Sequence, residues 1–66
     1  MSRISLKAMR VNKGLTQEES ATALGVTKKT ISYWESGRTK PSIEMVEPIC
    51  KLYECTYDDI DWTRVG

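Results

Sequence analysis

Two helix-forming segments of this chain are separated by only two residues, Gly25 and Val26. The first segment starts at Thr16, and the second starts at Thr27 and ends at Gly37. Threonine accepts hydrogen bonds from the free amides at a helix start, and glycine adopts the left-handed conformation that ends a helix. A connection this short predicts that the two helices cross steeply, with Val26 buried beneath the turn.

Similar signals divide the rest of the chain into helices. Ser2 or Ser5 can begin a first helix, which Gly14 ends, while Ser42 begins a fourth helix and Thr56 a short fifth. No alternating β-branched run and no hairpin dipeptide such as Asn-Gly occurs. The sequence therefore predicts a compact all-α fold of five short helices without a sheet.

Size and composition limit what this fold can contain. The chain has 66 residues, of which 39% are hydrophobic, so it supports one core and no enclosed substrate cavity. It has no histidine, the commonest general base and metal ligand. We therefore expect one domain over residues 1–66 that is not an enzyme and binds neither cofactor nor metal.

Redox and targeting signals are weak. Cys50 and Cys55 are too few for a disulfide framework and lack the partners of a zinc site. We expect small buried thiols, with a redox or intermolecular-disulfide role as the alternative. No run approaches the roughly 18 apolar residues of a membrane span, and no signal-peptide pattern opens the chain. We therefore expect a cytoplasmic protein without a membrane partner.

The spacing of apolar residues predicts which helix faces are buried. Ile31 and Trp34, three positions apart in the third helix, are expected to face the core. The same spacing in the fourth helix predicts a buried face made of Ile43, Val46, Ile49, Cys50 and Tyr53.

Charge is distributed unevenly along the chain. Residues 1–40 hold eight Lys and Arg against three Glu, whereas residues 41–66 hold two against six acidic residues. A polyanion would therefore approach the basic two-thirds and be repelled by the acidic third. The net charge is only +1, so two ordinary solvated faces are the alternative.

The residues around the short turn also resemble a known family. The chain reads Thr16-Gln-Glu-Glu-x-Ala21, then Leu24-Gly-Val26-Thr, then Ile31-Ser-x-Trp34-Glu35-x-Gly37, and then Lys40-Pro-Ser42. This string closely resembles the phage-repressor and Cro-like (XRE-type) helix-turn-helix DNA-binding family, with a resemblance extending from Leu6 to Ile60. It implies a λ-repressor-like domain whose helix-turn-helix spans residues 16–36. In that motif the first helix braces against the phosphate backbone and the second enters the major groove.

The resemblance also implies a role for individual residues. The expected base-reading residues are Lys28, Lys29, Ser32 and Tyr33. The expected phosphate-binding residues are Gln17, Thr27, Thr30, Arg38, Thr39 and Lys40. Arg10 and Glu35 match a partly buried ion pair that ties the first helix to the end of the third.

The chemistry of these side chains agrees with such roles. Lys28 and Lys29 are consecutive and therefore about 100° apart around a helix, so one can point at guanine O6/N7 while the other lies along a phosphate. Tyr33 lies one turn from Lys29, in reach of a thymine methyl or a phosphate. The alternatives are solubilising charge for the lysines, partial burial for Tyr33 and an ordinary helix-start role for Gln17.

Three positions depart from the family pattern. Ser20 replaces a usually larger apolar residue, so the second helix either packs less tightly or relies on a bulkier neighbour. Pro48 removes a backbone hydrogen bond inside the fourth helix and predicts a kink or irregular turn over residues 44–48. Glu54 stands where the family commonly has glycine.

The sequence thus predicts a sequence-specific transcriptional regulator of double-stranded DNA, a repressor that binds a pseudo-palindromic operator as a homodimer, in solution or only on DNA. The expected dimer contact is the fourth-to-fifth helix region with Trp62 and Val65, the alternative being that Trp62 folds back onto its own core. Two other functions remain open. One is an antitoxin-like regulator whose acidic C-terminal third binds a protein partner, and the other is a purely protein-binding module.

Overall fold

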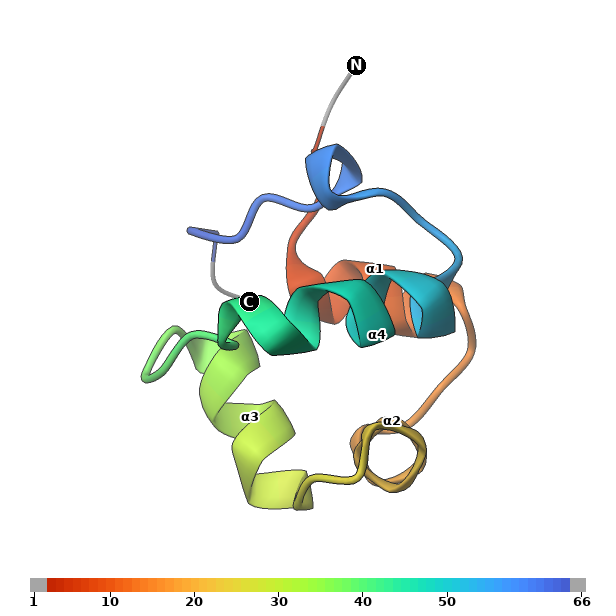
Figure 1. Cartoon of the computed structure of the whole chain (residues 1–66), viewed down its shortest axis with the longest axis vertical. Coiled ribbons are helices and arrows are strands. Elements are labelled where there is room, and N and C mark those ends of the chain that lie inside the picture. Colours follow the sequence, from red (N-terminus) through yellow and green to blue (C-terminus); the bar gives the residue numbers. More distant parts are fainter. Residues whose placement is uncertain (1–2, 65–66) are drawn as a thin grey trace.

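The computed structural model describes residues 3–64, which form a small bundle of helices (Figure 1). In chain order the elements are α1 (Leu6–Asn12), α2 (Gln17–Leu24), α3 (Lys28–Ser36), α4 (Ile43–Tyr53) and the 3-10 turn η1 (Tyr57–Asp59). Over these residues the fold is all-α, as expected, and strands are absent. The five-helix count is not confirmed, because four α-helices are followed by a single 3-10 turn.

The expected fifth helix is short because the chain must extend directly after it. Ile60 has an extended backbone and forms an isolated parallel bridge with Ile4. The Ile4 amide donates to the Asp59 carbonyl at 3.2 Å, and the Asp61 amide donates to the Ile4 carbonyl at 2.8 Å. An α-helix through these residues would use the same groups internally. The pairing therefore ends η1 after three residues.

Three of the four α-helices begin at the hydroxyl caps expected from the sequence. Ser5, Thr16 and Thr27 each accept a hydrogen bond from the amide three residues later, at 3.0–3.1 Å. The Glu19 carboxylate completes a capping box by accepting from the Thr16 amide at 2.8 Å. Ser42 occupies the cap position of α4 but makes no side-chain cap bond.

The turn between α2 and α3 has the predicted geometry. Gly25 ends α2 in the left-handed conformation at φ 72°, and the Val26 amide donates back to the Ala21 carbonyl at 3.0 Å. In Figure 1 α2 is seen end-on while α3 is seen from its side, so the two helices cross steeply. Val26 is half-buried, which is less than expected.

The core lies where α1, α4 and the segment after η1 meet. Leu6, Ile49, Tyr53 and Ile60 are buried there, and Trp34 of α3 packs against them as expected. Ile31 is also buried. The remaining partly buried residues of this cluster are Met9, Leu15, Leu24, Met45, Leu52, Cys55 and Trp62.

One expectation for the buried face of α4 is wrong. Ile43 is 83% exposed, because it lies in the first turn of the helix beside an open hollow that Tyr57 and Trp62 also line. Around Pro48, where a kink or an irregular turn is expected, α4 continues as an α-helix from Ile43 to Tyr53. Near this proline the first turn is tightened by a hydrogen bond of 2.9 Å from the Met45 amide to the Ser42 carbonyl.

The two cysteines are free thiols and half-buried. Burial raises the pKa of Cys55 to about 11, and the neighbouring Cys50 contributes to the same shift. Cys55 is therefore protonated at neutral pH, which disfavours nucleophilic chemistry.

No helix formed by residues 3–64 combines the length and the apolar character that crossing a membrane requires.

Candidate nucleic-acid interface

The outer side of α3 is open to solvent. Lys28 and Lys29 are exposed, and Ser32 and Tyr33 are half-buried. The buried residues Ile31 and Glu35 lie on the side of the helix opposite Lys29 and Tyr33. Lys28 has the spacing of the buried side but is exposed at the start of the helix. The packing of α3 therefore leaves its first two turns with a cationic outer surface.

Tyr33 lies between two cations on this surface. The Lys29 ammonium is 5.5 Å from the centre of the Tyr33 ring, and the Arg38 guanidinium is 4.8 Å from it. Arg38 reaches the ring because Gly37 ends α3 in a left-handed conformation, after which the Arg38 amide donates back to the Tyr33 carbonyl at 3.0 Å. The aromatic face attracts both cations and holds the loop against the helix.

The loop after α3 continues the basic surface. Arg38, Thr39 and Lys40 are all exposed, and the Thr39 amide also donates to the Tyr33 carbonyl, at 3.3 Å. The structure thus brings these loop residues beside the outer side of α3.

The hydroxyls of Thr27 and Thr30 are used first to start α3. Thr27 Oγ1 accepts from the Thr30 amide at 3.1 Å, and the two hydroxyl oxygens are 2.9 Å apart. Thr27 is exposed and Thr30 half-buried. Both residues lie at the start of α3, close to Lys28 in the chain.

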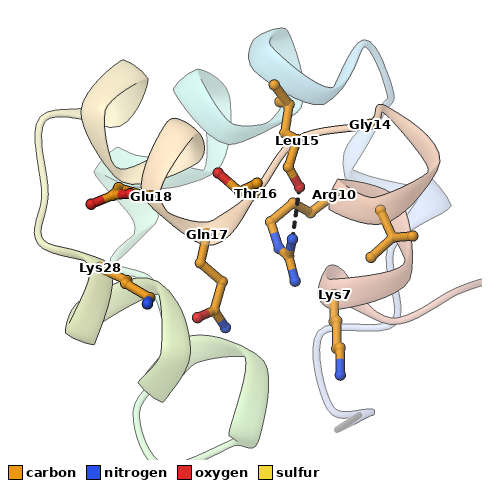
Figure 2. Close-up of a pocket in the computed structure, with 9 residues that line it drawn as sticks. Lys7, Arg10, Gly14, Leu15, Thr16, Gln17, Glu18 and Lys28 are labelled. Carbon is orange, nitrogen blue, oxygen red and sulfur yellow. Dashed lines mark hydrogen bonds between the residues drawn. The ribbon is translucent and has the colours of Figure 1, made fainter.

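A buried ion pair fixes α3 relative to α1 and α2. Arg10 Nε donates to Glu35 Oε2 at 2.6 Å and Arg10 Nη2 donates to Glu35 Oε1 at 3.2 Å, with Arg10 8% and Glu35 5% exposed. Arg10 Nη1 also donates to the Leu15 carbonyl at 2.7 Å (Figure 2). Gln17 Nε2 donates to Glu35 Oε1 at 3.0 Å. Four segments of the chain therefore meet at one satisfied network, which sets the position of α3.

Gln17 also lines a surface hollow between α1, α2 and the start of α3 (Figure 2). Lys7 and Lys28 line the same hollow. Lys7 is not among the site residues predicted from the sequence, although one feature of the sequence indicates it. The available signal was its spacing of three residues from Arg10, which places both on the side of α1 that faces α3.

The described residues offer no evident metal centre. Among residues 3–64 no group of three or more Cys, Asp or Glu side chains is arranged to hold a metal ion. The side chains on the outer side of α3 and on its following loop are instead hydrogen-bond donors and cations, which suit an anionic partner.

Comparison with known proteins identifies a family over most of the chain. A protein-family model described as helix-turn-helix matches residues 6–60. The HTH-type transcriptional activator BcrR of Enterococcus faecalis is 40% identical over 55 residues, which are 83% of this chain and 27% of BcrR. The cryptic phage CTXphi transcriptional repressor RstR of Vibrio cholerae is 40% identical over 48 residues, which are 73% of this chain and 43% of RstR.

A solved structure is also similar. The clp gene regulator ClgR of Corynebacterium glutamicum matches with a TM-score of 0.76 at 31% identity, over 82% of this chain and 57% of the ClgR chain. This chain therefore spans less than two-thirds of the length of each of these three proteins.

Proposed function

The chain belongs to the helix-turn-helix family, and on that premise we propose that it is a sequence-specific transcriptional regulator of double-stranded DNA. The observation that carries this proposal is the exposed cationic surface of α3, formed by Lys28 at the helix start and Lys29 on the outer side, while Ile31 and Glu35 are buried. An α-helix fits the major groove of B-form DNA but not the narrow major groove of A-form RNA.

In this proposal α3 lies in the major groove and its outer side chains face the base edges. The side chains that face the groove are Lys28, Lys29, Ser32 and Tyr33. Those that follow the phosphate backbone are Gln17, Thr27, Thr30, Arg38, Thr39 and Lys40. The ion pair of Arg10 with Glu35 contributes by holding α3 at a constant position relative to α2. We further propose that residues 1–66 form one domain with its helix-turn-helix over residues 16–36.

We propose that the regulator is a repressor that acts by occlusion, because a domain lying in the groove over a promoter blocks polymerase without any chemistry. RstR, named as a repressor, supports this direction, whereas BcrR is named as an activator. A reporter gene with the selected site placed over its promoter tests the sign. Expression that rises when the protein is present would contradict repression.

We propose that two copies bind a pseudo-palindromic site as a symmetric dimer. The supporting observation is the exposed apolar side of the α4 start and η1, where Ile43 is 83% and Tyr57 55% exposed. Trp62 folds back in part, since its ring stacks on Tyr57 at 5.4 Å and its Nε1 donates to the Tyr57 carbonyl at 3.0 Å. Val65 lies outside the described residues. Ile43→Glu should weaken cooperative binding to a two-half-site duplex while leaving single half-site binding unchanged.

Selection of bound duplexes from a random pool tests the whole proposal. We expect a recurring half-site, repeated with inverted orientation about one helical turn apart, and an affinity that falls steeply with salt. Absence of binding to any duplex at low salt would contradict DNA recognition and favour a protein-binding module.

A further inference from the structure

The hollow in Figure 2 lies beside the start of α3 and is lined by cations from α1 and α3. Lys7 comes from α1 and Lys28 from the first turn of α3, and Figure 2 draws the Gln17 amide of α2 between them. A second, adjoining hollow is lined by Lys7, Gln17, Ser32, Glu35 and Ser36. Lys7 and Gln17 line both hollows, which together form a depression between α1, α2 and α3 that Ser32 also lines.

The charges in this depression favour an anion. Arg10 also lines it, but the Glu35 carboxylate already accepts from the Arg10 guanidinium at 2.6 Å. Among residues 3–64 no ion pair joins Lys7 or Lys28 to a carboxylate. Glu18 is the acidic side chain on the rim of the larger hollow. Neither lysine is therefore in direct contact with a carboxylate.

Gln17 adds a fixed polar group between the two ammonium groups. Its Nε2 donates to Glu35 Oε1 at 3.0 Å, which holds the side chain in one orientation. An amide nitrogen carries two hydrogens, so the second remains for a ligand oxygen. An oriented donor between two exposed ammonium groups suits the several oxygens of a phosphate group.

We propose that this depression binds one phosphate of the DNA backbone, with Lys7 and Lys28 as its cations and Gln17 as its oriented donor. The proposal rests on the proposed DNA binding and refines it in two ways. It adds Lys7 of α1 to the interface. It also assigns Lys28 to the backbone, so that Lys29, beside the Tyr33 ring, is the lysine left to face the bases.

Salt dependence of duplex binding tests this assignment. Each lysine–phosphate contact releases condensed counterions, so its loss lowers the magnitude of the slope of log Kobs against log salt by about 0.9. Because Lys7 and Lys28 share one phosphate, the full decrease is expected in the double variant Lys7→Gln with Lys28→Gln, and each single variant should show a measurable part of it. Lys51→Gln is the matched control, because Lys51 is an exposed lysine of α4 that lines a different hollow. It should leave the slope unchanged, and Lys7→Arg should retain the wild-type slope.

Base specificity provides the second readout. Lys28→Gln should weaken binding to the selected site and to a scrambled duplex by the same factor, whereas Lys29→Gln should change the preference at one base pair. A wild-type slope in Lys7→Gln, or relaxed preference at one base pair in Lys28→Gln, would overturn the phosphate assignment while DNA binding stands. A wild-type protein that binds no duplex would overturn the proposed function itself. If each variant melts at the same temperature as the wild type, unfolding is excluded as the cause of a change in binding.

Discussion

The hydroxyl of Tyr53 donates a hydrogen bond of 3.0 Å to the hydroxyl of Ser20 in the interior, where Tyr53 is 2% and Ser20 0% exposed. The contact joins α4 to α2. The sequence left two possibilities for the small residue at position 20, namely looser packing or a bulkier neighbour. The bulkier neighbour is correct, because the Tyr53 ring occupies the adjacent space and its hydroxyl satisfies the serine.

Removing the Tyr53 hydroxyl should destabilise the fold. Tyr53→Phe leaves the buried Ser20 hydroxyl without its partner, and we expect the free energy of unfolding to fall by about 1–3 kcal/mol. Urea denaturation at neutral pH measures this. The double variant Ser20→Ala with Tyr53→Phe removes both polar groups and should lose less than Tyr53→Phe alone. Equal losses in the two variants would show that the hydrogen bond contributes nothing.

Stability should also fall in alkali through the same residue. Burial raises the pKa of Tyr53 above 10.0, the nearby Glu35 charge adds to the rise, and the Ser20 hydrogen bond opposes it. A pKa raised by folding means that the contribution is complete below pH 10.0 and is lost as pH rises through the folded-state value. The difference in unfolding free energy between wild type and Tyr53→Phe should therefore shrink above pH 10.0. A constant difference at all pH values would contradict this.

Breaking the buried ion pair should be more costly. Glu35→Ala leaves the Arg10 guanidinium, 8% exposed, without its carboxylate and also removes the acceptor of Gln17. We expect a loss of about 3–5 kcal/mol, measured by thermal or chemical denaturation. Replacing both partners, as Arg10→Met with Glu35→Leu, should restore much of the stability. Unchanged melting of Glu35→Ala would exclude a stabilising role for the pair.

The aromatic ring of Tyr33, rather than its hydroxyl, should support DNA binding. The ring lies 4.8 Å from the Arg38 guanidinium and 5.5 Å from the Lys29 ammonium, and each such contact contributes about 0.5–1 kcal/mol at an exposed site. Tyr33→Leu should weaken binding to the selected duplex severalfold, while Tyr33→Phe should bind as wild type. If Tyr33→Phe is as weak as Tyr33→Leu, the hydroxyl itself contacts DNA.

Glycine in place of Glu54 should stabilise the C-terminal end of α4. Glu54 has a left-handed backbone at φ 54°, which costs a residue with a side chain roughly 1–2 kcal/mol. Glu54→Gly should therefore raise the unfolding free energy by about 1 kcal/mol in high salt, where the exposed ion pair of Lys13 with Glu54 is screened. Glu54→Ala loses the ion pair and keeps the backbone strain, so it should be no more stable than wild type. If Glu54→Gly has a lower unfolding free energy than wild type in high salt, the backbone at Glu54 is not strained.

Helix starts and the central turn were predictable because their causes lie within a few residues. Thr16 and Glu19 form a capping box across three positions, and Gly25 supplies the left-handed residue that separates α2 from α3. The helical period that buries Ile31 and Glu35 while exposing Lys29 is likewise a property of one helix. These local features were enough to predict the all-α fold and the candidate reading helix.

Features that depend on distant segments could not be read in the same way. Ile43 shares the apolar spacing of α4 yet is exposed, because burial requires a neighbour that the spacing does not reveal. The fifth helix is reduced to η1 because Ile60 pairs with Ile4, far away in the chain. The placement of Lys7 and Lys28 at one hollow likewise depends on how α1 packs against α3. Local hydrogen bonds set where each helix begins and ends, whereas packing between helices sets which of their side chains meet.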